Sequence, residues 1–106
     1  MVDKQGRAWG VGRRKSAHAN VSVQLGDGDF RVNRKPLAEY FSDMDLRREA
    51  IAPLVVLRAC GAFDVQVTVK GGGVSGQAAA IKLGVARALA NFDPYLRPKL
   101  KSLKLL

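Results

Sequence analysis

The sequence predicts one small domain that contains both β-strands and α-helices. Its 106 residues, 47% of them hydrophobic, suffice for a single modest core. Two stretches alternate apolar and polar residues with the period of a half-buried strand, and a later stretch has the spacing of an amphipathic helix. No internal repeat, low-complexity tract or linker divides the chain, so we expect residues 1–106 to fold as one unit.

The first strand is predicted over residues 17–25. Its apolar residues alternate with His18, Asn20, Ser22 and Gln24, which gives the strand a neutral, polar outer face. A turn cluster follows at 26–29, and alternation resumes over 30–33. This pattern predicts a hairpin between the two strands.

Two helices are expected next. Pro36 suits the first turn of a short helix over 36–41. A second helical stretch runs from about 45 to 57, and Pro53 must kink or divide it. The clearest strand of the chain comes after them, where three valines of 65–70 alternate with polar residues.

A glycine-rich segment then leads into a long helix, for which Ser75 is a candidate cap. One apolar face of that helix consists of Ala78, Ile81, Val85, Ala88 and Phe92. Leu83 lies on the opposite side, so we expect the helix to be covered on more than one side. Residues 91–94 should end it, and a basic helix is predicted from about 95 to 103.

The charge distribution favours a polyanionic partner. The chain carries 18 Lys and Arg against 9 Asp and Glu, a net charge of +9. Residues 1–35 have eight basic and three acidic side chains, residues 36–69 have three and five, and residues 70–106 have seven and one. Because the excess avoids the middle of the chain, it indicates a binding footprint rather than an aid to solubility.

Other classes of protein find little support. Cys60 is the only cysteine, so the chain forms no internal disulfide; we expect a reducing compartment and a cysteine packed as a small hydrophobe. No apolar run is long enough to span a membrane, and the first residues lack the apolar core of a signal peptide. The sequence does not exclude an organellar presequence that was removed before the numbering begins. With one His and one Cys, no zinc site is expected.

The segment VKGGGVSGQAAAI at 69–81 matches two nucleotide-binding motifs in spacing only. A P-loop needs Lys and then Ser or Thr after its last glycine, but Gln77 and Ala78 stand there. A dinucleotide site needs a further strand with an acidic residue, and Asp93 instead lies at a predicted helix end. Gln77 also replaces the last glycine of a nucleophile elbow. His18, the single histidine, is predicted to be an ordinary surface group.

Glycines before a helix N-terminus nevertheless let phosphate approach the backbone closely, and Lys70 adds a charge there. We favour phosphate contact over a purely structural tight turn. A second basic cluster, Arg13, Arg14 and Lys15, precedes the first predicted strand, and Trp9 beside it could stack on a base or fill the core. One surface is expected to collect both clusters and the basic terminal helix.

Four segments together resemble the S-nine family of small-subunit ribosomal proteins. They are GRRKSA at 12–17, G-x-G at 26–28, VNRKPLAEYF at 32–41 and VKGGGVSGQAAAIKLGVARAL at 69–89. The likeness spans about residues 7–103, and the last segment is the most specific. The resemblance implies a single α+β domain whose small mixed sheet is covered by helices on one face, with a left-handed βαβ crossover like that of the second domain of ribosomal protein S-five.

The resemblance also implies binding to rRNA in the head of the small subunit, beside other ribosomal proteins. It implies no cofactor, no metal, no membrane and no small-molecule substrate. Carried over by position, the RNA contacts are Arg13, Arg14, Lys15, Lys70, Gly71, Gly72, Gly73, Ser75, Gln77 and Lys82. Lys35 and the cations of the terminal helix, Arg97, Lys99 and Lys101, complete the predicted set. Residues 1–15 are interpreted as a basic N-terminal extension and 94–106 as a basic helix with a truncated end.

The chain departs from the family pattern in two places. Asn20 stands where the family usually has Arg, and the chain stops at Leu106, where the family continues with a basic tail that ends near the peptidyl-site tRNA. Either the sequence is a fragment, or the tail is lost or supplied by another chain. We expect proximity to that tRNA without the tail contact. GRAWG at 6–10 resembles organellar members and favours the mitochondrial matrix over a bacterial-type cytoplasm.

The leading hypothesis is therefore a non-enzymatic structural constituent of the small ribosomal subunit. An alternative is a phosphotransferase-like fragment that binds ATP at the glycine loop, because metabolite kinases share the left-handed crossover. A free-standing RNA-binding module that acts outside the ribosome is a further alternative.

Overall fold

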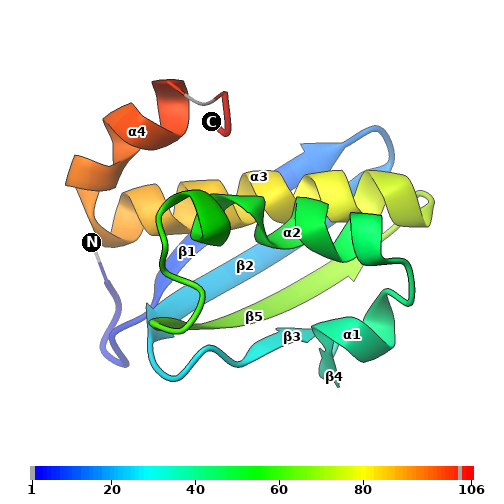
Figure 1. Ribbon diagram of the computed structural model, residues 1–106, viewed down its shortest axis with the longest axis horizontal. Helices are drawn as coiled ribbons and strands as arrows, with labels where there is room; N and C mark the ends of the chain where they lie inside the picture. Colours follow the sequence, from blue (N-terminus) through cyan, green and yellow to red (C-terminus); the bar gives the residue numbers. More distant parts are fainter. Residues whose placement is uncertain (1, 103) are drawn as a thin grey trace.

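The fold is a five-stranded mixed sheet with helices on one face, in a computed structural model that describes residues 2–102 and 104–106 (Figure 1). The strand order is β1-β2-β5-β3-β4. The strands are β1 (Ala8–Arg14), β2 (Ala17–Leu25), β3 (Phe30–Val32), β4 (Lys35–Pro36) and β5 (Phe63–Lys70). The helices are α1 (Leu37–Tyr40), α2 (Met44–Val56), α3 (Val74–Phe92) and α4 (Arg97–Ser102), with a 3-10 turn, η1 (Pro94–Leu96), before α4. The predicted α+β class is confirmed.

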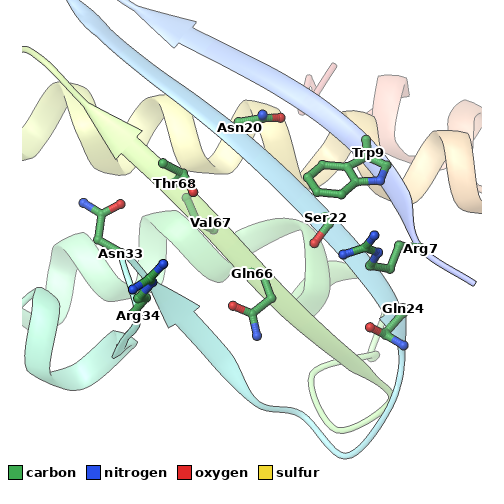
Figure 2. A pocket seen from close by; sticks show the side chains of 10 residues that line it. All are labelled: Arg7, Trp9, Asn20, Ser22, Gln24, Asn33, Arg34, Gln66, Val67 and Thr68. Atoms are coloured by element: carbon green, nitrogen blue, oxygen red, sulfur yellow. The ribbon is translucent and has the colours of Figure 1, made fainter. Parts of the chain in front are cut away.

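The core lies between the sheet and helices α2 and α3. Alternate residues of β2 and β5 are buried on the helix side, among them Val21, Val23, Val65 and Val67. Four of the five residues of the predicted apolar face of α3 are fully buried, and so are residues on other sides of that helix. The predicted covering of α3 on more than one side is therefore confirmed. Among the described residues, no helix lies on the opposite face of the sheet (Figures 1 and 2).

The parallel pair β3–β5 forms a crossover through α1 and α2. In Figure 1 both strands point to the right with the helices towards the viewer, and the chain moves up from β3 to β5, so the crossover is left-handed. The hairpin predicted between 17–25 and 30–33 is wrong, because β5 lies between β2 and β3. The carboxylate of Asp64 on β5 accepts hydrogen bonds from the backbone N–H groups of residues 27–29 and so holds the turn against β5.

Strand β1 was not predicted, and its composition explains why. The residues that face α3 are Ala8, Gly10 and Gly12, whereas Trp9 and Val11 are exposed, so the usual apolar-in pattern is inverted. A Cβ at Gly12 would collide with the backbone carbonyl of Ala80, which means that α3 lies directly on the strand backbone. Residues 8–14, which fall within the predicted N-terminal extension, thus form an edge strand of the sheet.

Of the two alternatives for Pro53, division of the helix is excluded, because α2 runs unbroken past it: its missing N–H costs one bond to the preceding turn, while its own carbonyl accepts from the N–H of Leu57. Two other local predictions are wrong. Ser75 lies inside α3, whose N-cap is Gly73 in extended conformation, without a side-chain cap. Cys60 is exposed, because the chain has already left the core in the turn after α2.

The terminal segment is basic and helical, as predicted. Residues 94–102 form η1 and α4, and Leu100 anchors α4 in the core with no exposed surface. Leu103, the predicted end of this helix, lies outside the described residues. In the part of the chain that the structure describes, no helix is long and apolar enough to cross a membrane.

Candidate nucleic-acid interface

The cluster of Arg13, Arg14 and Lys15 lies at the end of the β1–β2 hairpin. Arg13 and Arg14 are the last residues of β1, Lys15 and Ser16 form the connecting turn, and Arg14 pairs with Ala17. Lys15 has a left-handed backbone, with φ of 55°. All three cations are exposed, so their charges are available to a ligand.

Sheet register brings Lys70 to the same end of the molecule. Arg13 pairs with His18, and His18 pairs with Lys70, so the three side chains form one row across β1, β2 and β5 on the open face of the sheet. His18 is half-buried between the two cations. This row could not be predicted from the sequence, because it depends on β1 and its pairing with β2, neither of which was predicted.

The glycine loop, Gly71–Gly73, packs against the hairpin. Gly71 and Gly72 have φ of 80° and 66°, and added Cβ atoms would meet the backbone of Ser16 and Ala17. The fold therefore explains why glycine occupies these two positions. Gly73 has neither a positive φ nor a neighbour near its missing Cβ, so its backbone is open to a ligand. The structure thus brings two predicted clusters together, and Arg13, Arg14, Lys15, Lys70 and the glycine loop are called the basic end below.

Gln77 uses both ends of its side-chain amide within the protein. Its Nε2 donates to the carbonyl oxygen of Gly71 at 3.1 Å, and its Oε1 accepts from the Tyr40 hydroxyl at 2.7 Å. These two bonds tie the glycine loop to helices α3 and α1. In this arrangement Gln77 supports the shape of the loop.

The N-terminus of α3 opens beside the hairpin. No side chain caps it, and Arg14, Lys15, Ser75 and Gly76 line a shallow depression next to it. Glu49 of α2 lines the same depression and pairs with Lys82 of α3, with 3.2 Å between Oε2 and Nζ. Lys82, a predicted RNA contact, is thus partly neutralised at the flank of the basic end.

The remaining predicted cations lie elsewhere. Lys35 is exposed on β4, at the far edge of the sheet from β1. Arg97, Lys99 and Lys101 belong to α4, which sits at the C-terminal end of α3, opposite the glycine loop (Figure 1). The expectation that one surface collects all three basic segments is therefore wrong, because the 19 residues of α3 separate the last from the other two.

The open face of the sheet is a polar surface that sequence reasoning did not identify as a site (Figure 2). Trp9 lies at its edge with 43% of its surface exposed, so the alternative that it fills the core is wrong. The indole Nε1 donates to Asp3 at 3.1 Å, and the guanidinium carbon of Arg7 lies 5.1 Å from the ring centroid. The Trp9 hydrogen bond, followed by those from backbone N–H groups, lowers the pKa of Asp3 to about 2.

Known proteins resemble this chain over nearly its whole length. The profile of the family described as Ribosomal protein S9/S16 matches residues 12–106. Small ribosomal subunit protein uS9m of Arabidopsis thaliana is 45% identical over 102 residues, which cover 96% of this chain and 24% of that protein. The uS9 protein of Thermotoga neapolitana is 46% identical, with 92% and 75% covered. That of Chlorobium limicola is 46% identical, with 91% and 74% covered.

Proposed function

The chain belongs to the ribosomal protein S9/S16 family, and we propose that it is a structural constituent of the small ribosomal subunit that binds rRNA in the subunit head. The family is structural rather than enzymatic. The observation that carries the RNA-binding role is the basic end, where the cations of a rigid hairpin meet an open glycine loop and a helix N-terminus.

The basic end acts on phosphate rather than on base sequence. Arg13 and Arg14 offer guanidinium forks, which suit phosphate oxygens, and Lys15 and Lys70 add compact charges. The N–H groups at the start of α3 complement them, because a helix N-terminus carries partial positive charge. The contacts have a fixed geometry because the hairpin and the loop pack directly on each other.

The other predicted contacts take supporting places in this proposal. Ser75, on the first turn of α3, lies beside Arg14 and adds a hydroxyl to the phosphate site. Gln77 shapes the loop from within, and Lys82 contributes less than its charge suggests because Glu49 faces it. Lys35, Arg97, Lys99 and Lys101 reach separate RNA segments, since they lie away from the basic end.

Assembly tests the proposal directly. Replacing Arg13, Arg14 and Lys15 with Ala should reduce incorporation into small subunits in a reconstitution followed by sedimentation. A control that replaces Lys4, Arg48 and Arg58, which are also exposed, removes the same charge elsewhere and should leave incorporation near the wild-type level. Circular dichroism should show both variants folded, because every replaced side chain is exposed. Normal incorporation of the first variant would refute the role of the basic end.

The alternative of ATP binding at the glycine loop has no support from the family or the relatives. Gly71 and Gly72 are explained by packing against the hairpin, and Gln77 occupies the place of a catalytic lysine. We expect calorimetric titration with magnesium and ATP to show no saturable binding. A saturable, magnesium-dependent heat would restore the alternative.

The proposal also includes the cellular compartment of the protein and the molecules that surround it. The mitochondrial relative and the bacterial relatives are equally similar, so the GRAWG motif alone supports the mitochondrial matrix as the location. Neighbouring ribosomal proteins and a nearby peptidyl-site tRNA are the expected surroundings. Recovery of the protein with mitochondrial ribosomes in cell fractionation checks the location, and recovery only with other ribosomes would contradict it.

A further inference from the structure

The floor of the open face is built from neutral hydrogen-bonding side chains. Asn20 of β2 pairs with Thr68 of β5, and Ser22 pairs with Gln66, so these side chains stand in adjacent rows (Figure 2). Asn20, Gln66 and Thr68 are exposed. Within the described residues, their side chains form no hydrogen bond, and their donors and acceptors are therefore free for a ligand.

The rim of this floor combines an aromatic ring with positive charge. Trp9 stands on the β1 side, and Arg34 stands on the opposite side, beyond β5 (Figure 2). Asp3 compensates the nearby Arg7 through a hydrogen bond of 3.1 Å, whereas Arg34 has no acidic partner among the described residues. No Asp or Glu lines the depression. An acidic or polyanionic partner is consequently favoured over a basic one.

The floor is also continuous with the basic end. Asn20 and Thr68 are two residues from His18 and Lys70 along β2 and β5, which places the neutral rows next to the row of Arg13, His18 and Lys70 on the same face. A chain whose phosphates lie on that basic row can extend directly over the floor. The part of the ligand that lies over the floor can be uncharged, because the side chains of the floor are neutral.

We propose that the open face binds unpaired RNA bases, in a single-stranded or loop segment whose backbone is held by the basic end. This inference rests on the proposed function and adds a ligand class and a second set of contacts to it. Amide and hydroxyl groups match the donors and acceptors of base edges, and an exposed indole provides a stacking surface. An A-form duplex fits poorly, because its bases are stacked and paired, so that no base face is free to stack on Trp9 and the Watson–Crick edges are occupied.

Neutral substitutions test this face without changing charge. In the variant N20A/Q66A, affinity for an unstructured RNA of about ten nucleotides should fall by about tenfold or more. The dependence of that affinity on salt should keep its slope, since no cation is removed. Affinity for an RNA duplex of similar length should change little. Thr68→Val, which keeps the β-branched shape and removes only the hydroxyl, is a second variant with a smaller expected loss.

Each outcome bears on one claim. Unchanged single-strand affinity of N20A/Q66A and T68V, with thermal melting like that of the wild type, would overturn the proposal. Unchanged RNA affinity combined with failed incorporation into subunits would also overturn it and would identify the face as a protein-binding surface. The failure of the proposed function looks different: the R13A/R14A/K15A variant would then keep both the affinity and the salt slope of the wild type.

Discussion

Asp64 shows how a single side chain positions a long-range connection. Its Oδ1 accepts from the N–H groups of Asp27, Gly28 and Asp29 at 3.0 to 3.1 Å. The bond from Asp29, then that from Asp27, lowers the pKa of this carboxyl below its ordinary value of 3.8, because each bond favours the charged form. The turn after β2 thereby reaches past β5, and β3 can pair on its far side.

The stability of the protein should depend on pH through the ionisation of the Asp64 carboxyl. A depressed pKa in the folded state contributes stability that is fully present above pH 3.8 and is lost as the pH falls through the lower, folded-state pKa. We expect D64N to lower the melting temperature at pH 7, and the difference from the wild type to shrink below pH 3.8. A difference that stays constant through the acidic range would contradict this role.

Gln77 is the residue whose function is most easily misread from sequence. Its position in the glycine segment invites comparison with nucleotide motifs, but its amide bonds Gly71 and Tyr40. The contact with Tyr40 joins residues 37 positions apart, so no local pattern could have indicated it.

Replacing Gln77 with Ala should loosen the loop without removing charge. We predict weaker RNA binding with an unchanged salt slope, and faster amide hydrogen exchange at Gly71 and Gly72. Tyr40→Phe, which removes one of the two bonds, should have an intermediate effect. If exchange in the loop stayed at the wild-type rate in Q77A, the supporting role would be wrong.

At the scale of elements, the backbones of α3 and β1 pack closely together, and this contact is the hardest one to predict from the sequence. Gly10 and Gly12 let the helix backbone reach the strand, and two side chains of α3 bond the carbonyls of this edge strand. Arg87 Nη1 donates to Val11 at 2.6 Å, and Asn91 Nδ2 donates to Trp9 at 2.7 Å. The edge of the sheet is thus partly covered, which hinders pairing with another chain.

Substitution of Gly12 tests this packing. A Cβ there meets the backbone of Ala80 and Gly84, so Gly12→Ala should destabilise the fold by about 1–3 kcal/mol or more in chemical denaturation. Gly61→Ala is the matched control, because its Cβ would enter open space and its φ is not left-handed; its effect should stay within about 0.5 kcal/mol. Equal stability of the two variants would mean that α3 does not sit this close to β1.

At the scale of the whole molecule, the sequence predicted the regular elements of the core and the concentration of positive charge in the first and last thirds of the chain. Strand β5 and helix α3 were foreseen because valines and alanines follow a simple period there. Strand β1 was hidden because glycines occupy its buried positions, and the β3–β5 pairing was hidden because it depends on a crossover rather than on a turn. The left-handed sense of that crossover followed from family resemblance alone, since the usual preference is right-handed.

The candidate site was predictable to a similar extent. Arg13, Arg14, Lys15 and the glycine loop were identified by composition, and the fold places them against one another. Their separation from α4 and the neutral floor of the open face depend on sheet register and helix length, which no single segment encodes. Charge therefore indicates the class of partner, whereas the fold decides which charges act together.

The salt dependence of binding to small-subunit rRNA tests the central claim most directly. Binding constants measured over a range of salt should fall linearly on a double-logarithmic plot, because each phosphate contact releases counterions. For the R13A/R14A/K15A variant we predict a slope shallower by about 2–3, at about 0.7–0.9 for each lost contact. The control variant that lacks Lys4, Arg48 and Arg58 should keep the wild-type slope. Equal slopes for the wild type and R13A/R14A/K15A would contradict the account.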